Sequence, residues 1–202
     1  MGRMEEKMIS VNLEYFVNKE KEGVVFAKIT KAQKSDNLHG TYFPYEQYIG
    51  QVLDSSVNSD FIQSTIEPLD VAFGYFHYGN QITIVNFTKL AEVKSPLVFS
   101  TTENIKRGCF DVNALWVEAV LSLNEKRTFD FLFSHIHEET IKYMSGLAIG
   151  HLKAGNCDVG AHCLEEYIRN KKDTENQSVK EFQVENQKGC SQNGTPRIHY
   201  RL

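Results

Sequence analysis

The 202-residue sequence lacks the usual signals of a membrane, secreted or nucleic-acid-binding protein. No apolar run approaches the roughly 18 residues that a membrane-spanning helix needs, so no membrane partner is expected. The first ten residues are charged with no apolar stretch behind them, which predicts no secretory signal. The net charge is −4, from 26 acidic and 22 basic residues, and offers no basic face for nucleic acid. We therefore expect a cytoplasmic protein, although an effector exported by a non-classical route would look the same.

Cysteine is scarce and irregularly spaced. The chain has four cysteines, at positions 109, 157, 163 and 190. Without an export signal, such spacing does not indicate a disulfide framework. We expect all four to be free thiols in a reducing compartment.

The motifs of the best-known catalytic and nucleotide-binding sites are also missing. The sequence contains no G-x-x-x-x-G-K-[ST], no G-x-G-x-x-G and no G-x-S-x-G. These absences argue against a phosphate-binding loop, a dinucleotide fold and a hydrolase with a nucleophile elbow. No cofactor is expected, and an enzymatic role is disfavoured without being excluded.

Strand-like patterns dominate the first hundred residues. β-Branched and aromatic runs predict strands over 9–17, 24–29, 69–78, 82–87 and 97–101. Pro44 is well placed to begin a short helix over 44–52. These runs provide about five strands for a sheet.

The apolar period becomes helical from Asp111 onward. Helices are predicted over 112–123, 129–154 and 159–170, with Asp111, Thr128 and Asp158 as N-caps and Gly155 ending the second helix. The alternation of phenylalanines at 129, 131 and 133 leaves a short strand open as an alternative at that point. Strands followed by helices predict an α+β fold, with an antiparallel sheet from the N-terminal half packed against C-terminal helices.

A sharp change of composition follows Asn170. The next twenty residues are almost wholly polar and cannot bury enough apolar surface to offset the entropy of the chain. We therefore expect one domain over 1–170 and a polar, flexible tail over 171–202.

Histidine and cysteine gather between residues 135 and 163. The candidate metal ligands are His151, Cys157, His162 and Cys163, all of types that bind zinc. Their spacing matches no standard zinc finger or ribbon. His135 and His137, two apart on a predicted helix, point to different sides. The prediction is therefore that the protein holds no metal.

The same region offers a candidate thiol nucleophile. Cys157 lies just ahead of a predicted helix start, where the helix dipole would lower a thiol pKa. His151, His162 or His135 could act as its base, whereas Cys163 has the position of a core thiol. The enzymatic alternative is therefore a metal- or cysteine-dependent hydrolase or transferase that uses residues of 135–163.

Aromatic side chains crowd one short segment beside Pro44. They are Tyr42, Phe43, Tyr45 and Tyr48, and a helix start cannot turn all four inward. Aromatic residues are the usual anchors of protein interfaces. We therefore expect this segment to bind another protein, with a second copy of the chain as one option. The predicted function is a non-catalytic interaction module of the adaptor, chaperone-like, immunity or inhibitor type.

Overall fold

The computed structural model describes residues 8–32, 38–40, 42–61, 63–93, 98–101 and 105–190. The predicted α+β class is confirmed: the strands form an antiparallel sheet, and most of the helices follow them. The strands are β1 (Met8–Val11), β2 (Phe26–Thr30), β3 (Val52–Asp54), β4 (Ser64–Pro68), β5 (Gln81–Val85), β6 (Val98–Thr101), β7 (Phe110–Val112) and β8 (Ala114–Ser122). The helices are α1 (Leu13–Lys21), η1 (Tyr45–Tyr48), α2 (Leu69–Ala72), η2 (Phe73–Tyr78), α3 (Phe87–Val93), α5 (Lys126–His135), α6 (Glu138–Ala154) and α7 (Asp158–Cys190).

The eight strands lie in the order β1-β6-β7-β4-β2-β5-β8-β3. The β2–β5 ladder is complete, from Phe26 opposite Val85 to Thr30 opposite Gln81. The β2–β4 ladder has only two pairs, Phe26 with Pro68 and Ala27 with Glu67. The two strands therefore separate beyond Ala27, at the centre of the sheet.

Two segments predicted as strands are helical instead. The chain leaves the predicted strand at Asn12, whose Oδ1 accepts from the Glu14 amide at 3.0 Å and caps α1. The segment 69–78 forms α2 and η2, because its buried residues recur with helical spacing. The buried set is Leu69, Ala72, Phe73 and Phe76.

The helix predicted over 112–123 is wrong: the chain there forms β7 and β8. Apolar residues lie three and four apart in this stretch, which is why its period suggested a helix. The long-range ladders of β8 with β5 and β3 determine the outcome instead. Trp116 lies opposite Val52 in the β3–β8 ladder and is only partly buried.

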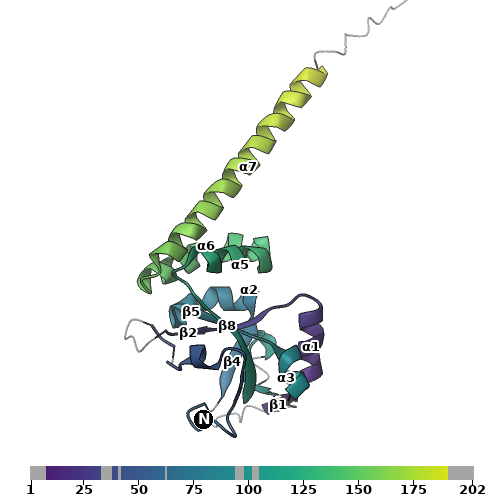
Figure 1. Ribbon diagram of the computed structural model, residues 1–202. Helices are drawn as coiled ribbons and strands as arrows, with labels where there is room; N and C mark the ends of the chain where they lie inside the picture. The colour runs from purple at the N-terminus through teal and green to yellow at the C-terminus, as the bar shows by residue number, and fades with distance from the viewer. Residues whose placement is uncertain are drawn as a thin grey trace, which may run out of the picture. The chain divides into compact units, whose positions relative to one another are not determined.

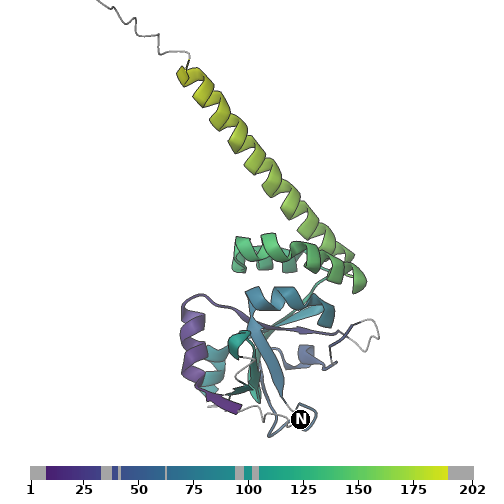
Figure 2. The same cartoon turned by 180° about the vertical axis from the view of Figure 1, so that it is seen from behind.

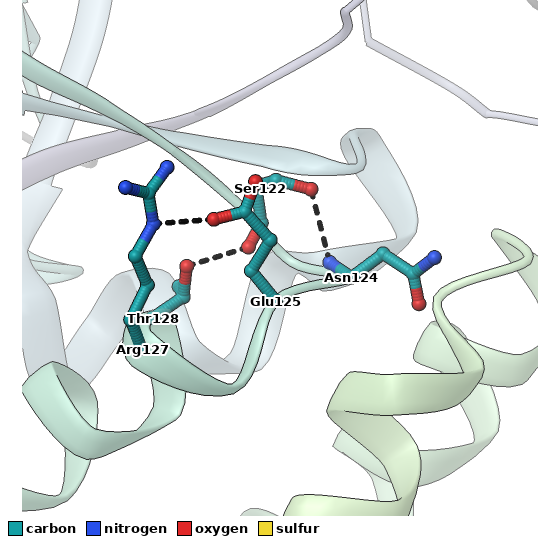
Figure 3. A network of polar contacts seen from close by, with 5 residues as sticks. All are labelled: Ser122, Asn124, Glu125, Arg127 and Thr128. Atoms are coloured by element: carbon teal, nitrogen blue, oxygen red, sulfur yellow. Dashed lines mark hydrogen bonds and ion pairs between the residues drawn. The ribbon is translucent and has the colours of Figure 1, made fainter.

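The long helix predicted over 129–154 is two helices, α5 and α6, and α6 ends at Ala154 with Gly155 as its C-cap. The chain breaks at Ile136, whose φ of −102° and ψ of 139° are extended. Figure 3 shows the turn that begins α5, where the Thr128 hydroxyl donates to the Ser122 carbonyl at 2.6 Å. In the same turn the Ser122 hydroxyl accepts from the Asn124 amide at 3.2 Å, and Arg127 pairs with Glu125. This turn explains why Thr128, predicted as an N-cap, lies inside the helix.

The main core lies between the sheet and α1 and α3, which lie side by side in both views (Figure 1, Figure 2). Phe16 of α1 is fully buried, with ring centroids 4.4–5.3 Å from those of Phe26, Phe87 and Phe110. Elsewhere in the same unit, α6 packs on η2.

The chain divides into two compact units, Met1–Leu164 and Glu165–Leu202. This boundary is close to the predicted one at residue 170, and it falls inside α7. The predicted tail from residue 171 is helical as far as Cys190, so the polar composition did not exclude a helix. Its flexibility remains a prediction. None of the described helices is long and apolar enough to cross a membrane.

Candidate functional site

The histidines and cysteines of 135–163 are distributed over three helices and the turns between them. His135 ends α5, is exposed, and has its Nδ1 2.8 Å from the Phe131 carbonyl oxygen. His151 lies on α6 with its ring 4.7 Å from that of His77. His162 and Cys163 lie on the first turns of α7. Within the described residues, no three His, Cys, Asp or Glu side chains are arranged so that they could hold a metal ion.

The Cys157 thiol does not have the environment expected of a nucleophile. Its side chain is buried, and Sγ donates to the Gly155 carbonyl oxygen at 3.6 Å. Burial, reinforced by the charge of Asp158, raises the pKa of Cys157 to about 11. The helix start therefore does not lower this pKa, because desolvation opposes the thiolate more strongly. The thiol stays protonated at neutral pH.

The aromatic segment beside Pro44 packs largely on the protein itself. The Phe43 ring lies 4.8 Å from Tyr45, 5.6 Å from Tyr48 and 5.7 Å from Phe61. Tyr45 is buried, and its hydroxyl lies 3.1 Å from that of Ser64. Tyr42 is the most open of the predicted four, at 37% exposed. The segment thus has one exposed end and a buried aromatic cluster behind it.

Three of these four aromatic residues line a cleft that opens where β2 and β4 separate. The cleft has a volume of about 590 Å³, within the range of small-molecule and peptide side-chain sites. Its aromatic lining is Tyr42, Phe43, Tyr45, Phe61, Tyr75 and Tyr78. Its polar lining is Lys28, His39, Asp60, Gln63, Thr65, Glu67 and Arg107, with Cys109 beside them. We call this the β2–β4 cleft.

Polar side chains of three neighbouring strands meet at this cleft. Lys28 of β2 donates from Nζ to the main-chain oxygen of Thr65 on β4, at 3.2 Å. Thr65 donates from its hydroxyl to Asp111 Oδ1 on β7 at 2.7 Å, and these two residues are register partners. Lys28 can reach that carbonyl because the β2–β4 ladder ends one residue earlier. Separation of the strands thus creates the cleft and brings the ammonium group into it.

Glu67 is the most unusual group in the β2–β4 cleft. Glu67 is only 9% exposed, and its Oε2 is buried with no hydrogen-bond partner among the residues that the structure describes. Burial raises the pKa of Glu67 to about 7, the Lys28 charge opposes the rise, and Asp111 adds to it. An unsatisfied buried carboxylate oxygen is costly, of the order of 1–3 kcal/mol. Such a group in a cleft is a candidate binding or catalytic residue.

Burial also favours the neutral forms of the groups around Glu67. It lowers the pKa of Lys28, against the charges of Glu67 and Asp111. It raises the pKa of Cys109, with Glu67 adding to the rise. The pKa of Tyr75 is raised by burial and then by Cys109. The cleft is therefore a partly desolvated site in which burial disfavours the charged forms of Lys28 and Glu67.

Sequence reasoning identified the aromatic wall of this cleft but missed its polar groups. Lys28 and Glu67 each interrupt an apolar run, between Ala27 and Ile29 and between Ile66 and Pro68. A charged residue inside a strand run was the one available signal, and it carries no information about a partner. The proximity of the two residues comes from strand pairing.

Comparison with known proteins adds no relative. No protein family, no curated protein and no solved structure matches this chain.

Proposed function

We propose that the protein is a non-catalytic interaction module that takes a segment of another protein into the β2–β4 cleft. The observation that carries this proposal is the buried, unpartnered Oε2 of Glu67 inside an aromatic-lined cleft. A bound segment that donates an N–H group to this oxygen would satisfy it. The same contact would stabilise the ionised carboxylate and so favour binding at neutral pH.

The lining supports a protein segment as the occupant. Tyr42 and Tyr78 are both more than a third exposed, and tyrosine anchors are common in protein interfaces. Lys28 and Gln63 supply donors, and Glu67 supplies an acceptor, which suits the alternating N–H and C=O groups of a peptide. The thiols support a non-catalytic role, because burial raises the pKa of both Cys109 and Cys157.

Selection from a phage-displayed library of random 12-residue peptides tests the proposal, with the full-length protein as bait. Selected peptides should shift the NMR signals of residues that line the cleft. Tyr42→Ala and Glu67→Ala should each weaken their binding at least tenfold. The matched control is Tyr143→Ala, which removes an exposed tyrosine of α6 outside the cleft. Failure to select any peptide, or equal binding by all three variants, would refute the proposal.

An acid–base enzyme is the second candidate function, because the pKa of Glu67 is about 7. A carboxyl group with that pKa is suited to general acid or base catalysis near neutral pH. Panels of p-nitrophenyl esters and phosphates test for it. Turnover that follows an apparent pKa near 7 and disappears in Glu67→Gln would favour the enzyme. The cysteine- or metal-dependent alternative gains no support from the positions of His135, His151, Cys157 and Cys163.

A further inference from the structure

Three histidines from separate segments meet beside the β2–β4 cleft. His39 precedes the aromatic segment, His77 lies in η2, and His151 lies on α6. The rings of His39 and His77 are 5.9 Å apart, and those of His77 and His151 are 4.7 Å apart. With Leu38 and Ala154 they line a second cavity, of about 300 Å³. We call these three residues the histidine cluster.

The histidine cluster has no acceptor for an added proton on two of its rings. Within the described parts of the chain, Nδ1 of His77 and Nδ1 of His151 are both buried without a hydrogen-bond partner. A protonated imidazole has two N–H donors, so protonation would leave a buried donor unsatisfied. Protonation of neighbouring rings at 4.7 Å would also place like charges close together.

The charges around the cluster also oppose protonation. Burial lowers the pKa of His77, and the charges of His151 and His39 lower it further. Burial alone lowers the pKa of His151. From η2 itself, Tyr78 and Tyr75 face His77 with ring distances of 4.1 and 6.1 Å.

The other elements packed on η2 contribute no compensating carboxylate to the pKa of His77. The strand β2 packs on η2 and brings the cation Lys28 to the β2–β4 cleft. The helix α6 brings His151, and α2 brings Asp70, whose Oδ1 accepts from the His137 amide at 2.9 Å. No carboxylate of the described residues is among the groups that shift the pKa of either histidine.

The cluster is joined to one wall of the cleft by two main-chain hydrogen bonds. The His39 amide donates to the His77 carbonyl at 3.1 Å, and the Gly40 amide donates to the Tyr78 carbonyl at 2.9 Å. The approach is close enough that a Cβ at Gly40 would lie 2.2 Å from the Tyr78 oxygen. His39 and Gly40 line the cleft, as do Tyr42 and Phe43 beyond them.

We propose that the histidine cluster is a proton-sensitive latch, which holds the cleft wall formed by residues 38–40 and 42–45 against η2 and releases it in mildly acidic solution. The end of η2 is fixed by its contact with β2, where a Cβ at Gly79 would meet the Thr30 oxygen at 1.9 Å. The wall carries His39, whose ring lies 5.9 Å from that of His77, so repulsion between these two rings pushes the wall away while this end of η2 stays in place. The consequence for binding rests on the proposed function: a partner segment would be released when the wall opens.

Hydrogen exchange of the His39 and Gly40 amides, followed by NMR on the full-length protein, tests the latch without any ligand. The measured quantity is the opening equilibrium constant between pH 7.5 and 5.5, corrected for the intrinsic exchange rate. The open state binds more protons than the closed state, because the pKa values of His77 and His151 are lowered in the closed state. Opening should therefore become about tenfold more favourable per pH unit for each proton gained, while the pH lies between the lowered pKa of the closed state and the pKa of the open state. The Thr83 amide of β5 serves as the reference for global unfolding.

Variants separate the latch from a general effect of acid. His77→Gln and His151→Gln should each reduce the pH dependence of opening, because each removes one protonatable ring. The matched control is His137→Gln, which changes an exposed histidine next to α6 and should retain the full dependence. If His77→Gln does not fold, His151→Gln and the titration of the His77 ring proton in the unmodified protein provide the same test.

Two results would overturn the latch: an opening constant that is unchanged down to pH 5.5, or a pH dependence that is equal in all variants. Neither result bears on peptide binding at neutral pH. Conversely, a latch that opens with acid would stand even if no peptide is ever selected. The two proposals therefore fail separately.

Discussion

Replacing Glu67 with glutamine should stabilise the protein at alkaline pH. Burial raises the pKa of Glu67 from 4.5 to about 7. Between those values the folded state retains a proton that the unfolded state has lost. The folded state thus binds more protons, and the free energy of unfolding falls as the pH rises from 4.5 through 7. At 1.36 kcal/mol per pKa unit, the loss is about 3 kcal/mol at full ionisation.

Glutamine has nearly the same shape as glutamate but cannot ionise, so Glu67→Gln avoids this loss. The free energy of unfolding of the variant, relative to the unmodified protein, should rise by about 3 kcal/mol from pH 4.5 to 8.5. Urea denaturation at half-unit pH intervals measures it. Contributions of the histidine cluster cancel in the difference, provided that its titration is independent of Glu67. Glu139→Gln, at an exposed position on α6, shows what the same chemical change does at the surface.

A difference that stays constant with pH would show that Glu67 is not held neutral by burial, and the reasoning behind the cleft would be wrong. A rise of this difference with pH would instead indicate that the ionised Glu67 carboxylate destabilises the folded state. Such a cost is typical of sites where binding or catalysis requires a strained or desolvated group. Peptide binding by the same variant should weaken, so stability and binding are expected to change in opposite directions.

Three further experiments test the packing of the core, a close contact of a helix and the reactivity of a thiol. Phe16→Ala removes a fully buried ring packed among three others, and chemical denaturation should show a loss of about 3–5 kcal/mol. Gly160→Ala should lower the melting temperature, because its Cβ would lie 2.2 Å from the Leu123 carbonyl oxygen. Gly146→Ala should instead raise the melting temperature, because nothing lies within 4 Å of the added Cβ and alanine stabilises a helix by about 0.5–1 kcal/mol relative to glycine. Equal effects of the two glycine substitutions on the melting temperature would contradict the packing around Gly160. Native Cys157 should resist iodoacetamide at pH 8, because its pKa of about 11 leaves almost no thiolate; mass spectrometry that finds it alkylated before denaturation would refute this.

The fold class and the start of the last helix could be predicted from sequence because both depend on local patterns, whereas the continuation of that helix from residue 171 to Cys190 was not predicted. Asp158 begins α7 as expected, and the β-branched run near residue 82 forms β5. The segment that became β8 was mistaken for a helix because the adjacent residues Ala114 and Leu115, which face opposite sides of the sheet, are both buried, so the start of the strand does not alternate. Its secondary structure is determined by partners far away in the chain.

The candidate site shows the same division between local and distant information. The aromatic cluster at Tyr42–Tyr48 could be recognised, because aromatic composition is visible in one segment. The polar part could not, since Lys28 and Glu67 become neighbours only when β2 pairs with β4 and the ladder stops after two pairs. The histidine cluster is similarly non-local, because His39 and His151 meet across His77 only after α6 packs on η2.

The order of strands also determines when during synthesis the protein can fold. The first strand, β1, has its partner in β6, at residues 98–101, and the three-residue β3 waits for β8 at residues 114–116. The central strand β5 is without one neighbour until β8 is complete at Ser122. A nascent chain therefore exposes unpaired strands until more than half of it has been made. Sheets closed by such distant pairs fold slowly, in milliseconds to seconds. Until then the unpaired strand edges can pair with other copies of the chain.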